Sequence, residues 1–305
     1  MKKFIVCTSI NYPTEAIEKF DSLPDWKLIV VGDLKTPTDF SLKNGIYMSP
    51  RDQIKMDEDL SDLIGWNSIQ RRNFGLAYAF KNDGDLIASV DDDNIPLGGW
   101  GSEILINRSL KIKEFQANDD AFDPIGATEY KGIWHRGFPL ELIKDRSYDD
   151  HTIKEITPSI QANFWNGDPD IDAFCRLEHK PECDFSPESF PFTSNKISPF
   201  NSQNTILARE VLLEYFLFPH VGRMDDIWAS YYVQAKGHRV VYDKATVYQK
   251  RNEHNLLEDL RKEYLGYENN LKLINSLYDS PGNINDYLPE RTLKAWSAYR
   301  KLLEK

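Results

Sequence analysis

Cysteine is scarce in this sequence, and long apolar runs are missing from it. The 305 residues include three cysteines, Cys7, Cys175 and Cys183, too few and too irregularly spaced for a disulfide framework. No apolar run reaches the length of about 18 residues that a transmembrane helix needs. The apolar stretch at 4–7 is too short for the core of a signal peptide. We therefore expect a cytoplasmic protein, either fully soluble or peripheral to a membrane.

Positive charge is also in the minority. The chain has 37 Lys and Arg residues against 48 Asp and Glu residues, a net charge of −11 at pH 7. A field of this sign disfavours general binding to nucleic acid or to anionic membranes, so a polyanionic ligand requires local cations or a metal ion at its site. Hydrophobic residues make up 41% and charged residues 28%. This composition excludes a largely disordered chain and is typical of one large or two smaller globular domains.

Strand and helix signals alternate in the first half. Short apolar runs at 4–7 and 26–31 predict buried strands, and Thr14 caps a predicted helix between them that runs to about Leu23. This βαβ succession predicts a parallel sheet and an α/β fold. Apolar residues at helical spacing predict a helix over 66–80, and the run at 86–90 predicts another buried strand. Residues 34–64 have weak periodicity and are predicted to be loops and short turns.

The second half is less regular until its end. Residues 120–198 are rich in Pro, Gly, Asp and aromatic residues, which predicts long loops with short strands. Further strands are predicted at 203–207 and 238–242, and helices at 208–216, 225–235, 256–277 and 289–303. The sequence therefore divides into an α/β domain over 1–252 and a helical appendage over 253–305. We interpret the appendage as a cover for the sheet; a homodimer contact or a membrane contact are the alternatives.

Three consecutive carboxylates follow the buried strand at 86–90. Ligands of open α/β sheets bind at the carboxyl ends of strands, where Asp91, Asp92 and Asp93 stand. Two adjacent carboxylates repel each other by about 4 kcal/mol at an effective dielectric constant near 20. A divalent cation removes that repulsion, and carboxylate oxygens suit Mg²⁺ or Mn²⁺. The triplet predicts a metal site, with a solvated turn that caps a helix as the alternative.

Several segments carry a resemblance to known families. The segments WNSIQRRNFG at 66–75, VDDDN at 90–94, PFNSQNT at 199–205 and RMDDIW at 223–228 resemble the STELLO glycosyltransferases. The segments HRGFP at 135–139 and DDIW at 225–228 are also similar to the plant reversibly glycosylated polypeptides, which are UDP-arabinopyranose mutases. The resemblance covers about residues 4–255. It implies a GT-A fold, which is a Rossmann-like fold of nucleotide-diphospho-sugar transferases, followed here by C-terminal helices.

The resemblance also implies a nucleotide site. Thr8 and Asn11, after the first strand, approach the nucleoside, and Asp33 accepts a hydrogen bond from uracil or ribose. Turn formation is the alternative for these residues. Arg72 grips a phosphate or a carboxylate, or forms a structural salt bridge. The remaining implied ligands bind the diphosphate and the metal: Asp91, Asp92, Lys250 and Arg251 for the nucleotide, and Asp91, Asp93 and His254 for the ion.

Two acidic residues at the start of the helix at 225–235 complete the implied chemistry. In inverting GT-A enzymes an acidic residue at the corresponding place acts as the base towards the acceptor hydroxyl. Asp226 matches the position that STELLO-like sequences share, and Asp225 either caps the helix or contacts sugar hydroxyls.

Arg136 separates the two families. The matching arginine of the mutases becomes glycosylated, so the resemblance implies a sugar adduct at Arg136 if mutase chemistry applies. Asp168 and Trp165 lie further along the chain and are candidates for lining the sugar pocket, with core packing as the alternative for the ring.

The resemblance as a whole predicts a glycosyltransferase. It moves a sugar from a UDP-linked donor to a glycan or lipid-linked acceptor, depends on Mn²⁺ or Mg²⁺, and inverts the anomeric centre. The alternatives are a UDP-sugar mutase, and a protein that binds sugars or nucleotides without catalysis. Turnover of a UDP-sugar without acceptor distinguishes the mutase, and binding without any turnover distinguishes the binding protein.

Overall fold

One mixed sheet runs through the whole molecule. The computed structural model describes residues 1–250 and 255–304. The strand order is β3-β2-β1-β4-β10-β8-β11-β9-β6-β7, and β5 pairs with β11. The strands are β1 (Lys3–Thr8), β2 (Lys27–Val31), β3 (Ile46–Met48), β4 (Leu86–Val90), β5 (Asn94–Pro96), β6 (Leu110–Phe115), β7 (His151–Ile156), β8 (Ile160–Gly167), β9 (Phe192–Ser194), β10 (Asn204–Ala208) and β11 (Val240–Gln249).

The predicted βαβ unit is confirmed. Helix α1 (Glu15–Asp21) follows Thr14, whose side chain accepts a hydrogen bond from the backbone N–H of Ile17 and so caps the helix. Strand β1 pairs in parallel with both β2 and β4. The carboxyl ends of these three strands therefore meet at one edge of the sheet. Beyond β4 the pairing changes, because β10 runs antiparallel to β4.

The prediction of loops for residues 34–64 is wrong. This segment contains β3 and two helices, α2 (Pro50–Met56) and α3 (Glu58–Ile64). Each helix has seven residues, too few for a clear helical period. Local caps mark them instead: Ser49 and Asp52 form a capping box, and the Asp57 side chain accepts from the N–H of Leu60.

The other helices follow the predicted pattern with shifted bounds. The segment predicted as a helix over 66–80 contains the 3₁₀ turn η1 (Ile69–Arg71) and then α4 (Arg72–Lys81). Helix α6 (Asp225–Ala235) has the predicted bounds. The helix predicted at 208–216 is wrong, because only a 3₁₀ turn, η4 (Arg209–Leu213), forms there. The remaining helical elements are η2 (Leu140–Leu142), α5 (Ala173–Glu178), η3 (Pro187–Ser189), η5 (Gly222–Met224), α7 (Leu256–Asp279), η6 (Pro281–Asp286) and α8 (Glu290–Glu304).

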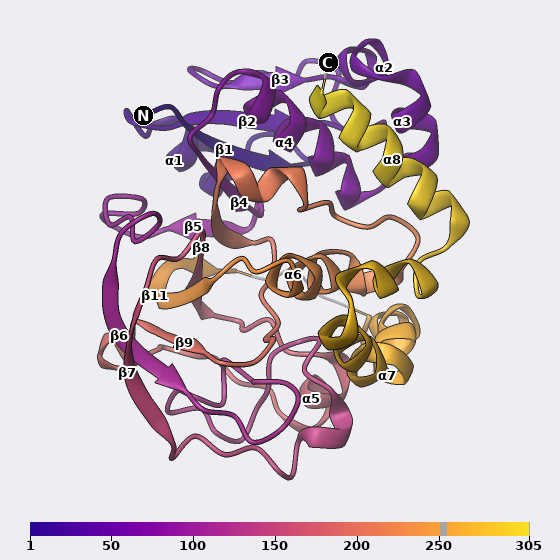
Figure 1. Cartoon of the computed structure of the whole chain (residues 1–305). Helices are drawn as coiled ribbons and strands as arrows, with labels where there is room; N and C mark the ends of the chain where they lie inside the picture. Colours follow the sequence, from indigo (N-terminus) through magenta and orange to yellow (C-terminus); the bar gives the residue numbers. More distant parts are fainter. Residues whose placement is uncertain (251–254, 305) are drawn as a thin grey trace.

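The C-terminal helices pack on both halves of the molecule. Helix α7 lies against α5, α6 and η5, whereas α8 crosses α3 and α4 near the N-terminal strands (Figure 1). Leu273 of α7 and Tyr299 of α8 are fully buried in the same hydrophobic cluster as the central strands. The C-terminal helices thus pack mainly on other helices of the α/β body, and not directly on the sheet as we expected, while the domain boundary at 252/253 stays a prediction.

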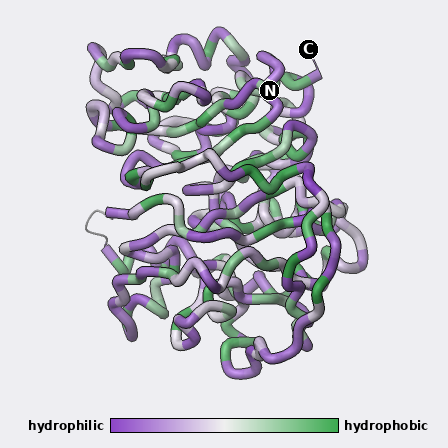
Figure 2. The backbone as a smooth tube through the Cα atoms, turned by 90° about the vertical axis from the view of Figure 1, so that its left-hand side faces the viewer, coloured by the Kyte–Doolittle hydropathy of each residue, from purple (hydrophilic) through white to green (hydrophobic). Residues whose placement is uncertain are grey.

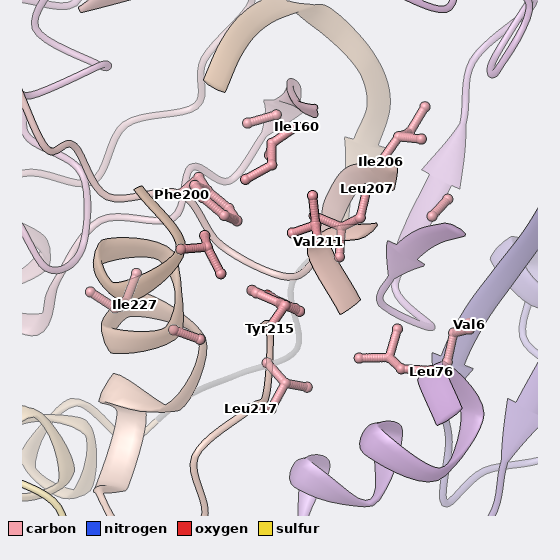
Figure 3. Packing of buried hydrophobic residues seen from close by; sticks show 14 of the residues in the cluster. Val6, Leu76, Ile160, Phe200, Ile206, Leu207, Val211, Tyr215, Leu217 and Ile227 are labelled. Carbon is pink, nitrogen blue, oxygen red and sulfur yellow. The ribbon is translucent and has the colours of Figure 1, made fainter. Parts of the chain in front are cut away.

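The core lies between the central strands and their covering helices. Hydrophobic segments run through the interior and hydrophilic ones lie toward the outer edges (Figure 2). Figure 3 shows Val211, Tyr215 and Leu217 between Leu76 of α4 and Ile227 of α6. The segment that follows β10 therefore packs between these two helices. Within the described residues, no helix is long and apolar enough to cross a membrane.

Candidate active site

Two adjoining cavities lie at the edge where β1, β2 and β4 end. The first, of about 370 Å³, is lined by the residues that follow these strands, by Lys35 and by the start of α4. The second, of about 690 Å³, opens towards the start of α6 and receives Lys262 of α7 and Arg291 of α8. Both cavities are lined by Asn67, Ser68, Ile69, Asp91 and Asp93. Asp91 and Asp93 therefore stand on the wall that the cavities share.

Arg72 points from α4 into this wall. Its Nη2 donates to Asp91 at 2.6 Å and to the Thr8 hydroxyl at 3.2 Å, and its Nη1 donates to the backbone carbonyl of Ser202 at 2.8 Å. Burial alone lowers the pKa of Arg72, but the charge of Asp91 and smaller contributions raise it above its ordinary value. Arg72 is thus a fixed cation that orients one carboxylate of the triplet.

Its neighbour Arg71 also lines the first cavity, but its guanidinium is bonded to α2 and α3. Nε of Arg71 donates to Gln53 at 2.7 Å, Nη1 donates to the carbonyl of Ser61 at 3.0 Å, and the guanidinium lies 3.7 Å from the ring centre of Trp66. Burial lowers the pKa of Arg71 to about 10. Arg71 therefore holds α2 and α3 against α4, and the sequence-based choice of Arg72 for the site agrees with this geometry.

The middle carboxylate of the triplet anchors the loop after β1. Asp92 accepts hydrogen bonds from the hydroxyl of Ser9 at 2.6 Å and from the amide of Asn11 at 3.4 Å, and its backbone carbonyl accepts from Thr14. Burial raises the pKa of Asp92. Asp92 and Asn11 thus shape the first cavity together.

Asp33 is buried and holds a second loop of the first cavity. Its carboxylate accepts from the backbone N–H groups of Leu34 at 2.6 Å, Asn67 at 2.9 Å and Ser68 at 3.0 Å. These bonds fix the 67–69 segment that lines both cavities.

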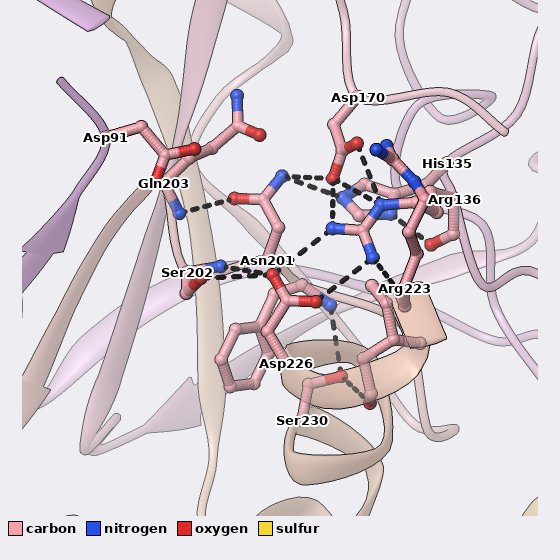
Figure 4. Close-up of polar contacts among 12 residues, drawn as sticks. Asp91, His135, Arg136, Asp170, Asn201, Ser202, Gln203, Arg223, Asp226 and Ser230 are labelled. Atoms are coloured by element: carbon pink, nitrogen blue, oxygen red, sulfur yellow. Dashed lines mark hydrogen bonds and ion pairs between the residues drawn. The ribbon is translucent and has the colours of Figure 1, made fainter. Parts of the chain in front are cut away.

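A buried ion-pair network fills the wall of the second cavity (Figure 4). Arg136 donates to Asp170 through Nε at 2.9 Å and through Nη2 at 2.9 Å. It donates to Asp226 through Nη1 at 3.0 Å and Nη2 at 3.2 Å, and Nη1 also donates to the carbonyl of Arg223. Burial alone lowers the pKa of Arg136, but the two carboxylates outweigh burial and raise it well above its ordinary value.

Asp226 also accepts hydrogen bonds from Ser202, which lies just before β10. Its Oδ2 accepts from the backbone N–H of Ser202 at 2.9 Å and from the Ser202 hydroxyl at 3.1 Å. Because Ser202 also accepts from Arg72 at 3.0 Å, the networks around Asp91 and around Asp226 are joined through one serine.

Asp225 lies in a different environment, although it is adjacent in sequence. Its carboxylate accepts from the side-chain amide of Gln70 at 2.6 Å, and it lines the second cavity while 7% of its surface is exposed. Burial, followed by the charge of Asp226, raises the pKa of Asp225 to about 7.

The structure does not bring every predicted residue to the cavities. Trp165 packs in the core against Phe164 and the ring of His135, and it lines neither cavity. Asp168 pairs with Arg176 at 2.6 Å and also lines neither cavity. The backbone N–H of Lys250 donates to the carbonyl of Asp93 at 3.2 Å. Arg251 and His254 lie outside the described residues.

Sequence reasoning gave no role to Ser68, Gln70 and Ser202. All three lie in the segments that carry the family resemblance, which is the one signal that marks them. Their hydrogen bonds join residues distant in sequence, and no local pattern encodes such contacts.

Protein side chains alone do not form a complete metal site in the described part of the chain. Within residues 1–250 and 255–304, no group of three or more His, Cys, Asp and Glu side chains is arranged to hold an ion. The oxygens of Asp91 and Asp93 on the shared wall are hard ligands of the kind that Mg²⁺ and Mn²⁺ accept, and these ions usually keep positions for substrate phosphates and water. The donor set therefore fits an ion that the substrate helps to hold.

Comparisons with known proteins support the fold and the resemblance. No family model matches the chain. Two Arabidopsis thaliana proteins, probable glycosyltransferases STELLO1 and STELLO2, are each 23% identical to it over 253 residues, or 76% of this chain. The match covers 33% of each relative, so the chain spans about a third of their length. These two matches confirm the predicted resemblance to the STELLO glycosyltransferases.

A solved structure has the same fold. It is glucosyl-3-phosphoglycerate synthase from Mycobacterium tuberculosis in complex with Mn²⁺, uridine diphosphate and phosphoglyceric acid, with a TM-score of 0.50 and 12% sequence identity. The match covers 90% of this chain and 78% of that chain. The GT-A fold with C-terminal helices, predicted from the sequence, is thereby confirmed.

Proposed function

We propose that this protein is a metal-dependent glycosyltransferase that moves a sugar from a UDP-linked donor to a hydroxyl acceptor. The observation that carries the proposal is the pair of adjoining cavities with Asp91 and Asp93 on their shared wall. One cavity takes the nucleotide and the other takes the acceptor, so the diphosphate and the anomeric carbon come to lie at the wall. The names of the STELLO relatives support the same reaction class.

The first cavity is the proposed nucleotide site. Thr8 and Asn11 line it after β1, and Asp33 fixes the loop opposite them. The synthase with the same fold was solved with uridine diphosphate and Mn²⁺, which supports UDP as the nucleotide. Asp33 contributes by shaping the wall, since its carboxylate is engaged by three backbone N–H groups.

Asp91 and Asp93 are the proposed ligands of a Mn²⁺ or Mg²⁺ ion, with His254 as a further expected ligand. When bound, the ion supplies Lewis-acid stabilisation to the departing diphosphate. Arg72 keeps Asp91 in place through their 2.6 Å ion pair. Lys250 and Arg251 remain the expected cations for the diphosphate, because they follow β11 directly.

The mutase alternative requires Arg136 to act as a nucleophile, which its surroundings oppose. Nε and both terminal nitrogens of Arg136 donate to Asp170, Asp226 and the Arg223 carbonyl. A guanidinium attacks an anomeric carbon only after it loses a proton, and the two carboxylates raise its pKa. We propose that Arg136 positions Asp226 and forms no sugar adduct. The inverting outcome, the glycan or lipid-linked acceptor and the homodimer stay predictions.

Calorimetric titration with UDP, with and without MnCl₂, tests the proposal. We expect UDP to bind the wild-type protein much more tightly with Mn²⁺, and Asp93→Asn to lose this gain. Asp279→Asn, a change of an exposed carboxylate at the end of α7, serves as the matched control. Release of UDP from a panel of UDP-sugars then identifies the donor. The proposal is wrong if Mn²⁺ does not change the affinity for UDP, or if Asp93→Asn behaves like the control.

A further inference from the structure

The two carboxylates that open α6 differ in their capacity to accept a proton. Asp226 accepts two hydrogen bonds from Arg136 and two from Ser202, so both of its oxygens are engaged by donors. Asp225 is engaged by one side chain, the amide of Gln70, and by the backbone N–H of Asp226. A carboxylate paired with a buried guanidinium is stabilised in its charged form and is a poor base.

We propose that Asp225, positioned by Gln70, takes the proton from the acceptor hydroxyl, and that Asp226 serves as the counter-ion that holds Arg136. The inference rests on the proposed transferase function and departs from the sequence-based assignment of Asp226 as the base. In the step, the acceptor oxygen forms a bond to the anomeric carbon, and the bond from that carbon to the diphosphate oxygen breaks. UDP leaves with the electron pair, and the hydroxyl proton moves to the carboxylate of Asp225.

The orientation of Gln70 is fixed by a second residue. The hydroxyl of Ser68 donates to Oε1 of Gln70, which leaves the amide nitrogen of Gln70 to donate to Asp225 at 2.6 Å. The backbone N–H of Ser68 is in turn held by Asp33 at 3.0 Å. Ser68 lines both cavities. The carboxylate of Asp225 is therefore tied to the wall of the nucleotide cavity, and Gln70 is a positioning residue.

Burial and the charges around Asp225 bring its pKa close to neutral pH. Burial and the charge of Asp226 raise its pKa to about 7, while Arg136 and the hydrogen bond from Gln70 lower it. A base whose pKa lies near the working pH combines a sizeable ionised fraction with a strong tendency to take a proton. Other titratable or charged groups that face it across the second cavity are Asp91, Asp93, Asp170, His220, Arg223, Lys262 and Arg291, and Tyr215 lies close enough to interact with it.

The test is the pH dependence of UDP release from UDP-glucose, UDP-galactose, UDP-N-acetylglucosamine and UDP-arabinose with Mn²⁺, with water as acceptor. For wild-type protein we expect the rate to rise through an apparent pKa near 7. Asp225→Asn lowers the rate by about 100-fold or more and keeps the affinity for UDP. Asp243→Asn, a change of another buried carboxyl with a raised pKa that lines neither cavity, leaves both unchanged.

Two further variants separate the roles of the neighbours. Gln70→Met removes the donor to Asp225, so the rising limb of the pH profile moves to higher pH. Gln116→Met, a change of a half-buried glutamine that directly follows β6 and lines neither cavity, does not move it. Asp226→Asn removes the charge that raises the pKa of Asp225, so a limb persists and moves to lower pH. The inference is overturned if Asp225→Asn keeps the wild-type rate, or if Asp226→Asn abolishes the limb.

A titration of the carboxyl groups by ¹³C NMR keeps the inference testable if none of the donors is turned over. We expect two carboxyl signals near pH 7, from Asp172 and Asp225. The Asp225 signal disappears in Asp225→Asn and moves to higher pH in Gln70→Met, whereas the Asp172 signal stays in both variants. A signal assigned to Asp225 that titrates near pH 4 refutes the inference. Failure of the proposed function is a separate result, because it shows as the absence of metal-dependent UDP binding by the wild-type protein.

Discussion

Asp172 makes the stability of the fold depend on pH in a way that can be measured. It is the N-cap of α5, where its carboxylate accepts from the N–H of Cys175 at 2.8 Å and from the indole of Trp134, and it is almost completely buried. Burial, with a contribution from the charge of Glu263, raises its pKa from 3.8 to about 7. The protonated form is therefore the one that the folded state favours.

The sign and size of the effect follow from proton linkage. Because the folded pKa lies above the unfolded one, the stabilisation from Asp172 is complete below pH 3.8 and is lost as the pH rises through about 7. At about 1.4 kcal/mol per pKa unit, the rise from pH 5 to pH 8 removes roughly 3 kcal/mol. For a chain of this length that corresponds to a change in Tm of roughly 5 °C.

The assay is the Tm measured by circular dichroism at pH 5 and pH 8 for wild-type protein and Asp172→Asn. Asparagine still caps a helix but does not titrate, so the variant lacks this part of the pH dependence. The difference between the two proteins isolates Asp172 from other groups that titrate in this range. Asp279→Asn, at an exposed position, is the control. If wild-type protein and Asp172→Asn lose the same Tm between the two pH values, the linkage described here is refuted.

Three further changes test separate parts of the structure. Arg71→Met removes the buried donors that join α2 and α3 to α4, and lowers the free energy of unfolding by about 2–4 kcal/mol. Urea denaturation measures this loss. A loss no larger than that of Lys55→Met, at an exposed position, contradicts the structural role of Arg71. Gly222→Ala places a Cβ 2.0 Å from the carbonyl oxygen of Lys262, at a residue whose φ is +64°, so it lowers the free energy of unfolding by more than about 1 kcal/mol. Unchanged protection of the α7 amides in hydrogen exchange contradicts this expectation. Ser202→Ala removes the hydroxyl that joins Arg72 to Asp226. UDP release then slows by about tenfold or more, an amount typical of a hydrogen bond to a charged group, while the affinity for UDP is kept. An unchanged rate of UDP release contradicts the connection between Arg72 and Asp226 through Ser202.

The parts of the fold that the sequence predicts are those with strong local signals. The strands of the βαβ unit are continuous apolar runs, and Thr14 is an explicit cap, so the first parallel pairing follows directly. Helix α6 has an acidic start and a glycine just beyond its end, which mark its bounds. In contrast, α2 and α3 are too short for periodicity, and the segment after β10 closes into a 3₁₀ turn because tertiary packing overrides its helical pattern.

The site was predictable in its residue types more than in its connections. A carboxylate triplet at a strand end indicates a cation, whereas the family resemblance, and not the acidic helix start itself, implied acid–base chemistry at Asp226. The sequence does not show that Arg136 reaches Asp226 across 90 positions, or that Arg71 bonds to α2 and α3 whereas Arg72 bonds to Asp91. It also does not show which of two adjacent aspartates is neutralised by an ion pair. These properties depend on tertiary contacts that no local pattern encodes.

The serine that joins the two hydrogen-bond networks has a consequence for how this protein can acquire new specificities. Asp91, Arg72, Ser202, Asp226 and Arg136 are joined by one continuous run of hydrogen bonds and ion pairs, in which only the Asp91 side chain is partly exposed, so we expect a substitution at any of them to disturb both cavities at once. We therefore expect substitutions to be tolerated best at exposed residues that line the second cavity, such as His220, Lys262 and Arg291. On the proposed function, laboratory evolution towards new acceptors starts best at these three positions.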